Sequence, residues 1–172
     1  KYTGLDYPVC LDPTLLADSN IWKPMFNSKW REKNYIVSYY IRVNNADKIT
    51  INNKMQKYAN TLGCEIINLD ATVNALPVEE FISIIRYARY VVTDSFHGII
   101  FSLLFHRCFN ALVFHDSGDS RYINLLSSLG LEKACVEITF SPNQWSIDYE
   151  SVDEKLNRMR MPSQMYLRNN LC

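Results

Sequence analysis

Apolar and polar residues follow two patterns along this chain, one typical of strands and one typical of helices. Short runs rich in β-branched and aromatic residues predict strands over 35–41, 64–69, 90–93, 110–114 and 134–138. Apolar residues at helical spacing predict helices over 47–62, 77–89, 96–106 and 121–129, and two polar helices, 148–160 and 163–170, follow at the end. Strands that alternate with helices predict an α/β fold, in which a parallel sheet carries helices on both faces.

Three segments are expected. Residues 1–34 have no regular rhythm and fit a connecting segment that packs on the domain through Trp22 and Trp30. Within it, residues 7–11 fit a short strand, and residues 12–16 fit a turn into a short helix. Residues 35–147 form the α/β unit, and residues 148–172 form the C-terminal helices. Because the chain starts at Lys1 without a methionine, we expect an excised domain or the downstream half of a larger protein.

The stretch from 90 to 110 carries the clearest chemical signal. A strand over 90–93 is followed by a polar turn and an apolar helix, for which Asp94 or Ser95 fits the N-cap. Free N–H groups and the helix dipole make such a helix start a site for an anion. His97 can exchange a proton near neutral pH, and Gly98 lets another backbone or a ligand come close. His97 fits an acid or anion ligand as well as it fits a histidine that only hydrogen-bonds in a loop.

The loops that follow the strands should meet at one edge of the sheet, because ligands bind beyond the carboxyl ends of parallel strands. We therefore expect one crevice faced by residues that are far apart in the sequence. They are Arg42, Asn44, His97, His115, Ser117, Gly118, Ser120 and Arg121.

The segment 118–121 resembles a second anion site. Gly118 would adopt an unusual dihedral angle, Ser120 would cap the following helix, and Arg121 would grip a phosphate or carboxylate in bidentate fashion. An ordinary loop with a solvated arginine fits this pattern equally well.

Composition narrows the classes of function. Lysine plus arginine and aspartate plus glutamate each number 18, so the net charge is zero and a nucleic-acid partner has no support. The five cysteines are far apart and include no C-x-x-C, which favours free thiols in a reducing cytosol over disulfides or a zinc site. Neither G-x-G-x-x-G nor a Walker motif is present, so a nucleotide site has only weak support. We expect no metal and no cofactor.

Several of these segments resemble the polysaccharide pyruvyl transferase family. The likeness rests on residues 77–85 (PVEEFISII), 90–98 (YVVTDSFHG) and 101–105 (FSLLF). Residues 12–16 (DPTLL) resemble the family's entry into its C-terminal domain. Residues 118–126 (GDSRYINLL) and 129–132 (LGLE) resemble a downstream Ser-Arg and Leu-Leu segment. The likeness covers roughly residues 9–137.

The resemblance implies a two-domain, GT-B-like bacterial enzyme, of which this chain would be the Rossmann-like, C-terminal, donor-binding half. Such enzymes move a pyruvyl group from phosphoenolpyruvate to a sugar of a cell-surface polysaccharide, as a ketal. The expected partners are phosphoenolpyruvate, a glycan or lipid-linked saccharide acceptor, and a missing N-terminal domain. The expected location is the cytoplasm, with peripheral attachment to the inner face of the membrane left open.

The resemblance also assigns roles to residues. The motif histidine corresponds to His97, the expected catalytic residue. Many members have Arg-Leu where this chain has Ser95-Phe96, so Arg121 or Arg42 is expected to supply the cation that holds the donor. The expected substrate-binding residues are Ser95, Phe96, Gly98, Gly118, Ser120, Arg121 and Arg42.

Two other functions fit the sequence. One is the donor domain of a GT-B glycosyltransferase that binds a nucleotide sugar in the same crevice. The other is a non-catalytic module that binds a sugar or a phosphate.

Overall fold

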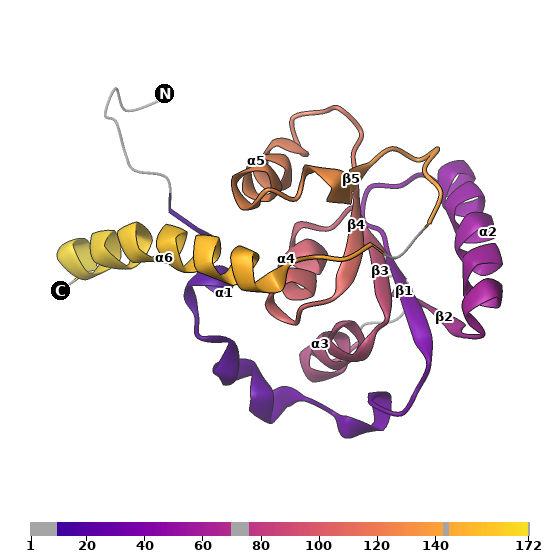
Figure 1. Ribbon diagram of the computed structural model, residues 1–172, viewed down its shortest axis with the longest axis horizontal. Coiled ribbons are helices and arrows are strands. Elements are labelled where there is room, and N and C mark those ends of the chain that lie inside the picture. Colours follow the sequence, from indigo (N-terminus) through magenta and orange to yellow (C-terminus); the bar gives the residue numbers. More distant parts are fainter. Residues whose placement is uncertain (1–9, 70–75, 143–144, 172) are drawn as a thin grey trace.

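Five parallel strands form the centre of the molecule (Figure 1). The computed structural model describes residues 10–69, 76–142 and 145–171. The strands are β1 (Tyr35–Tyr39), β2 (Glu65–Leu69), β3 (Tyr90–Thr93), β4 (Cys108–Leu112) and β5 (Cys135–Val136), in the order β2-β1-β3-β4-β5. This confirms the predicted α/β fold, a Rossmann-like parallel sheet. The chain leaves β1 for β2 on one side and returns to pair β3 on the other, so the order reverses between β1 and β3.

Helices cover both faces of the sheet, but unequally. One face packs against α2 (Asn45–Leu62), which contributes Ile51, Met55 and Ala59 to a core cluster. The other face packs against α3 (Val78–Tyr87), α4 (Phe96–Leu104) and α5 (Ser120–Leu129). Alternate strand residues point to opposite faces, so Tyr90 and Val92 join the α2 cluster while Val91 joins the other. Among the described residues, no helix is long and apolar enough to cross a bilayer.

The segment before β1 packs on the domain through aromatic side chains. It contains α1 (Pro13–Leu16) and two short 3-10 helices, η1 (Ser19–Met25) and η2 (Ser28–Trp30). The ring of Trp22 meets Phe101 edge-on at 5.2 Å, and the ring of Trp30 meets Tyr35 at 5.6 Å. The short helix after Asp12 and the two tryptophan anchors are therefore confirmed. Most of the strand predicted at 7–11 lies outside the described residues.

Several strands and helices begin or end at other residues than predicted. The strand predicted at 110–114 is β4, which begins two residues earlier because Cys108 pairs with Tyr90 in the parallel ladder. The strand predicted at 134–138 is reduced to the two residues of β5, after a 3-10 turn, η3 (Glu132–Ala134). The strand predicted at 90–93 has the bounds of β3, and the other predicted strands and helices differ from the observed ones by one or two residues at one or both ends.

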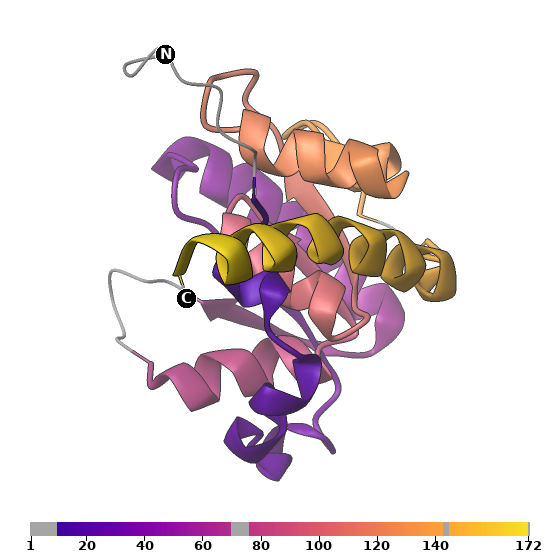
Figure 2. The ribbon, with the colours of Figure 1, turned by 90° about the vertical axis from the view of Figure 1, so that its left-hand side faces the viewer.

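The prediction of two C-terminal helices is wrong. A single helix, α6 (Tyr149–Leu171), continues through Pro162. Contacts from the first segment hold it on both sides of the proline. Arg160 donates to the Leu15 carbonyl at 2.5 Å, and Ser163 Oγ accepts the Leu11 N–H at 3.1 Å. Figure 2 shows α6 lying across the domain between α5 and α1, which it contacts.

Candidate functional site

The candidate site lies where the strand order reverses. β1 and β3 are neighbours, and their carboxyl ends lead into the loop after Tyr39 and the turn before α4. In open parallel sheets this switch point leaves a crevice, because the connections on its two sides run in opposite directions.

Asp94 joins the two loops at this point. Only 3% of the residue is exposed. Its carboxylate accepts the backbone N–H groups of Ile41, Arg42 and Val43 at 2.6, 2.7 and 2.9 Å. Asp94 is therefore not the cap of α4. It fixes the loop after β1 against the turn after β3.

Ser95 caps α4, as one of the two predictions had it. Its Oγ accepts the Gly98 N–H at 3.3 Å, and its own N–H donates to Thr93 Oγ1 at 2.9 Å. Gly98 lies against the end of β3, where an added Cβ would come within 2.6 Å of Thr93 Oγ1. The close approach that Gly98 permits is thus to the protein's own strand, and it brings the start of α4 close to the sheet.

His97 projects from the first turn of α4 towards solvent. Its side chain is 57% exposed, and its Nε2 lies 3.9 Å from Oδ2 of Asp12. Asp12 is itself held in place, because its Oδ1 accepts the Thr14 N–H at 2.9 Å and caps α1. An accessible imidazole beside a fixed carboxylate suits a group that donates a proton to a bound ligand.

Arg42 is engaged within the protein. Its guanidinium donates to Asp116 at 2.9 Å, to Asp119 at 2.5 Å and to the Tyr122 hydroxyl at 2.9 Å. It also lies over the Phe114 ring at 4.8 Å. Two carboxylates therefore already offset the charge of Arg42.

Asp119 is the buried centre of this cluster, with 1% of the residue exposed. It accepts the N–H groups of Phe114 and His115 at 2.6 and 2.7 Å, as well as bonds from Tyr122 and Arg42. Burial alone would raise the pKa of Asp119, but these hydrogen bonds outweigh it and hold the pKa below its ordinary value.

Gly118 makes room for this cluster. A Cβ at this position would come within 2.6 Å of the Arg42 guanidinium. Its φ is not in the left-handed region, which among the described glycines is adopted by Gly63 and Gly130. The unusual dihedral angle predicted for Gly118 is therefore wrong. The N-cap of α5 is Asp119, not Ser120, whose hydroxyl donates to the Ser117 carbonyl at 2.9 Å.

Arg121 borders a separate cavity of about 500 Å³ between α4, α5 and the segment before α1. Its guanidinium lies over the Phe96 ring at 5.1 Å. Within the described part of the chain, no carboxylate lies within ion-pairing distance of Arg121. The cavity also contains Asp12, the residue beside His97. The polar and aromatic side chains that line the cavity include Asp12, Phe96, Ser120, Arg121 and Asn124.

The residues that were predicted to face one crevice therefore lie in separate places. Phe96, Ser120 and Arg121 meet at one cavity, and His97 adjoins it through Asp12. The other predicted members face elsewhere. Asn44 caps α2, His115 pairs with Glu137 at 3.2 Å, and Arg42 and Gly118 belong to the Asp119 cluster.

Two carboxylates that organise these side chains, Asp12 and Asp119, were not singled out from the sequence. Asp12 precedes a proline and a threonine, a helix-start signal that could have drawn attention to it. Asp119 has no such signal, because its charged partner, Arg42, is 77 residues away in the sequence. Among the described residues, no group of three or more histidine, cysteine, aspartate or glutamate side chains is placed to hold a metal.

The fold and the site define an α/β domain with a ligand-sized cavity at the start of α4, lined by both polar and apolar side chains. The chain belongs to the polysaccharide pyruvyl transferase family, whose model matches residues 1–116. No curated protein and no solved structure matched the chain. The matched residues include Asp12, Arg42 and His97, and they end before Arg121.

Proposed function

We propose that this chain is the donor-binding half of an enzyme that transfers the pyruvyl group of phosphoenolpyruvate to a sugar as a ketal. The observation that carries the proposal is that two groups occur together at the start of α4. His97 is accessible there, and the guanidinium of Arg121 lies over the ring of Phe96, the residue before His97. Membership of the polysaccharide pyruvyl transferase family supports the reaction class.

His97 is the proposed proton donor. Protonation of the methylene carbon of phosphoenolpyruvate turns it into a methyl group and leaves a cationic centre at the neighbouring carbon. One sugar hydroxyl adds to this centre, and a second displaces the phosphate. The two sugar hydroxyl groups release two protons. One replaces the proton that His97 gave to the carbon, and the other leaves with the phosphate as hydrogen phosphate. His97 is recharged by the first of them, as expected of a general acid that then serves as a base.

Arg121 is the proposed cation for the donor. Phosphoenolpyruvate carries a phosphate and a carboxylate, and an arginine binds either group through two parallel hydrogen bonds. The stacked Phe96 ring limits the freedom of the guanidinium while its hydrogen-bonding edge stays available. We prefer Arg121 to Arg42, because Asp116 and Asp119 already engage Arg42.

Ser95, Gly98 and Ser120 support this site in the proposal. The N-cap Ser95 and the small Gly98 set the start of α4, where free backbone N–H groups favour an anion. Ser120 lines the cavity wall. The same proposal includes an acceptor saccharide and a second domain that binds it and pairs with this one in a GT-B-like arrangement. It also includes action at the inner face of the membrane.

Calorimetric titration of the chain tests the donor. Phosphoenolpyruvate should bind, and Arg121→Ala should weaken its binding at least tenfold, because the hydrogen bonds of the guanidinium to a charged group are lost. Phe96→Leu should weaken it about two- to fivefold, because only the stacking is lost. Arg158→Ala is the control, since Arg158 is an exposed residue of α6 paired with Glu154. Binding of a nucleotide sugar instead would favour a glycosyltransferase.

The acid is tested by His97→Gln in the enzyme that includes its acceptor-binding half. Loss of general acid catalysis should lower the transfer rate by about two to four orders of magnitude. Phosphoenolpyruvate should still bind, because Arg121 is intact. A variant that keeps most of its transfer activity would exclude His97 as the acid. Binding of neither donor class to the unmodified chain would favour the non-catalytic module.

A further inference from the structure

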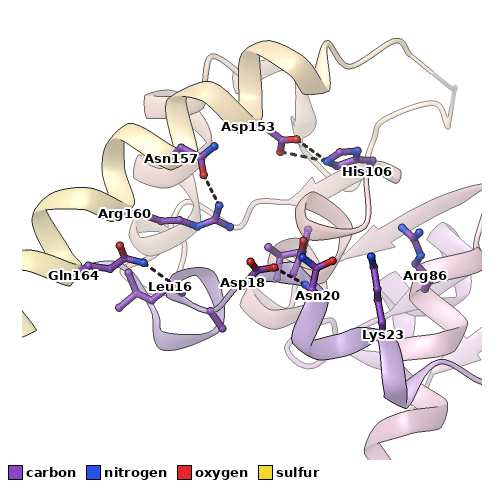
Figure 3. A pocket seen from close by; sticks show the side chains of 13 residues that line it. Leu16, Asp18, Asn20, Lys23, Arg86, His106, Asp153, Asn157, Arg160 and Gln164 are labelled. Carbon is purple, nitrogen blue, oxygen red and sulfur yellow. Dashed lines mark hydrogen bonds and ion pairs between the residues drawn. The ribbon is translucent and has the colours of Figure 1, made fainter.

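A second cavity, of about 600 Å³, lies away from the candidate site (Figure 3). It is bordered by Arg86 in the last turn of α3 and by His106, which follows α4 and precedes β4. It is therefore near the amino ends of β3 and β4, whereas His97 follows the carboxyl end of β3. α1 separates the two cavities, since Leu15 lines one and Leu16 lines the other.

Three cations face this cavity from different elements. Figure 3 shows Lys23 of η1 and Arg86 of α3 on one side, and Arg160 of α6 across from them. Within the described part of the chain, none of the three has a carboxylate oxygen within 4.0 Å, the limit for an ion pair. Three separate elements thus bring unpaired positive charge to one space.

The two arginines are held in fixed positions. Arg86 donates to the Phe105 carbonyl at 3.3 Å and lies over the rings of Phe26 and Phe105 at 5.4 and 5.7 Å. Arg160 donates through Nε to the Leu15 carbonyl at 2.5 Å and through Nη1 to Asn157 at 2.7 Å. These bonds use only part of each guanidinium, so both arginines keep donors for a ligand.

The carboxylates of the cavity do not cancel this charge. Asp153 pairs with His106 at 3.0 Å, and Asp18 accepts the Asn20 N–H at 2.7 Å. Burial lowers the pKa of Arg160, and the more distant charges of Asp153 and Asp18 only partly oppose the shift. A bound anion would offset the burial of this guanidinium.

The remaining lining is neutral and polar, with some apolar surface. Ser19, Asn20, Asn157 and Gln164 supply hydroxyl and amide groups, and Leu16 and Leu104 supply apolar contact. Hydroxyl and amide side chains suit the hydroxyl groups of a saccharide, and the volume is within the usual range for a small-molecule site. From the three unpaired cations and this lining, we propose that the cavity binds a phosphorylated sugar, at a site separate from the one that contains Arg121.

Binding of glucose 6-phosphate to the 172-residue chain, followed by nuclear magnetic resonance, tests this proposal. The amide signals of Lys23, Arg86 and Asn157 should shift on titration. Lys23→Glu should weaken binding roughly tenfold, as expected when one hydrogen bond between charged groups is lost. Lys23 is exposed, so its replacement should leave the fold intact. Lys57→Glu, an equal charge reversal on the exposed side of α2, should leave the affinity unchanged.

Inorganic phosphate and glucose are the matched probes, and each should bind at least tenfold more weakly than glucose 6-phosphate. Phosphate that binds as tightly as glucose 6-phosphate would overturn the assignment of a sugar. The site itself would be excluded if glucose 6-phosphate fails to bind, if Lys23→Glu leaves its affinity unchanged, or if the shifted signals belong to residues 120–124.

Discussion

Oδ2 of Asp94 accepts the backbone N–H of Arg42 at 2.7 Å, across the point where the strand order reverses. The same carboxylate also accepts the N–H groups of Ile41 and Val43, so one buried side chain holds three consecutive backbone donors. The turn after β3 therefore contains a residue whose contacts fix the loop after a different strand, β1.

Asp94→Asn should destabilise the protein. The amide group can accept fewer N–H groups than the carboxylate and adds donors that face them. We expect the free energy of unfolding to fall by about 2–4 kcal/mol, because buried N–H groups lose charged acceptors. Urea denaturation measures this. Asp47→Asn, in the first turn of α2, should lower it by less than about 1 kcal/mol. Equal losses in the two variants would contradict a special role for Asp94.

Gly98→Ala should force α4 away from β3. The new Cβ would lie 2.6 Å from Thr93 Oγ1 and 3.2 Å from Thr93 Cβ. We expect a loss of about 1–3 kcal/mol in the free energy of unfolding, the usual effect of overpacking. Thr93→Ala in the same chain should recover part of this loss, because the closest atom is removed. A double-mutant cycle without coupling between the two sites would show that Thr93 is not the obstacle.

A decrease in pH should weaken the ion pair between Arg42 and Asp119. Because the pKa of Asp119 is lowered in the folded protein, its contribution to stability is complete above the ordinary aspartate pKa of about 4. The contribution is lost as the pH falls further, through the folded pKa. Asp119→Asn should cost about 3 kcal/mol at pH 7, as for a broken buried ion pair, and less at pH 3.

Asp116→Asn is the matched control for Asp119, because the two carboxylates share Arg42. The side chain of Asp116 is 56% exposed and that of Asp119 is 1% exposed. The exposed ion pair between Arg42 and Asp116 should contribute about 1 kcal/mol or less to the free energy of unfolding. Denaturation curves over a range of pH distinguish the two. A difference between the Asp119 variant and the unmodified protein that stays constant down to pH 3 would contradict the shifted pKa.

Pro162→Ala should strengthen the second half of α6. Proline removes one hydrogen bond of the helix and crowds the preceding turn. We expect amide protection over residues 163–170 to rise tenfold or more, since about 1.4 kcal/mol corresponds to a factor of ten. Hydrogen exchange measures it, with Met161→Ala at the neighbouring exposed position as the control. Unchanged protection would mean that the contacts with the first segment, rather than Pro162, determine local opening.

Local patterns were sufficient to predict the sheet and the start of α4. Runs of β-branched and aromatic residues predicted β1 and β3, and the polar turn before an apolar run predicted a cap at Asp94 or Ser95, of which Ser95 is the one observed. The partners of Arg42 were beyond such patterns, because Asp116 and Asp119 are 74 and 77 residues away. The continuity of α6 through Pro162 has the same explanation. Its support comes from Leu11 and Leu15 at the other end of the chain.

Two consecutive residues of α1 line different cavities, Leu15 one and Leu16 the other, and this restricts the length of the segment around them. An α-helix turns by about 100° per residue, so one inserted residue would redirect every later side chain of the helix. Leu15 and Leu16 would then leave both linings together, and the carbonyl groups that bond Arg160 and Gln164 would move with them. Insertions and deletions should therefore be rarer between residues 12 and 19 than in surface loops of related chains, even where the side chains themselves differ.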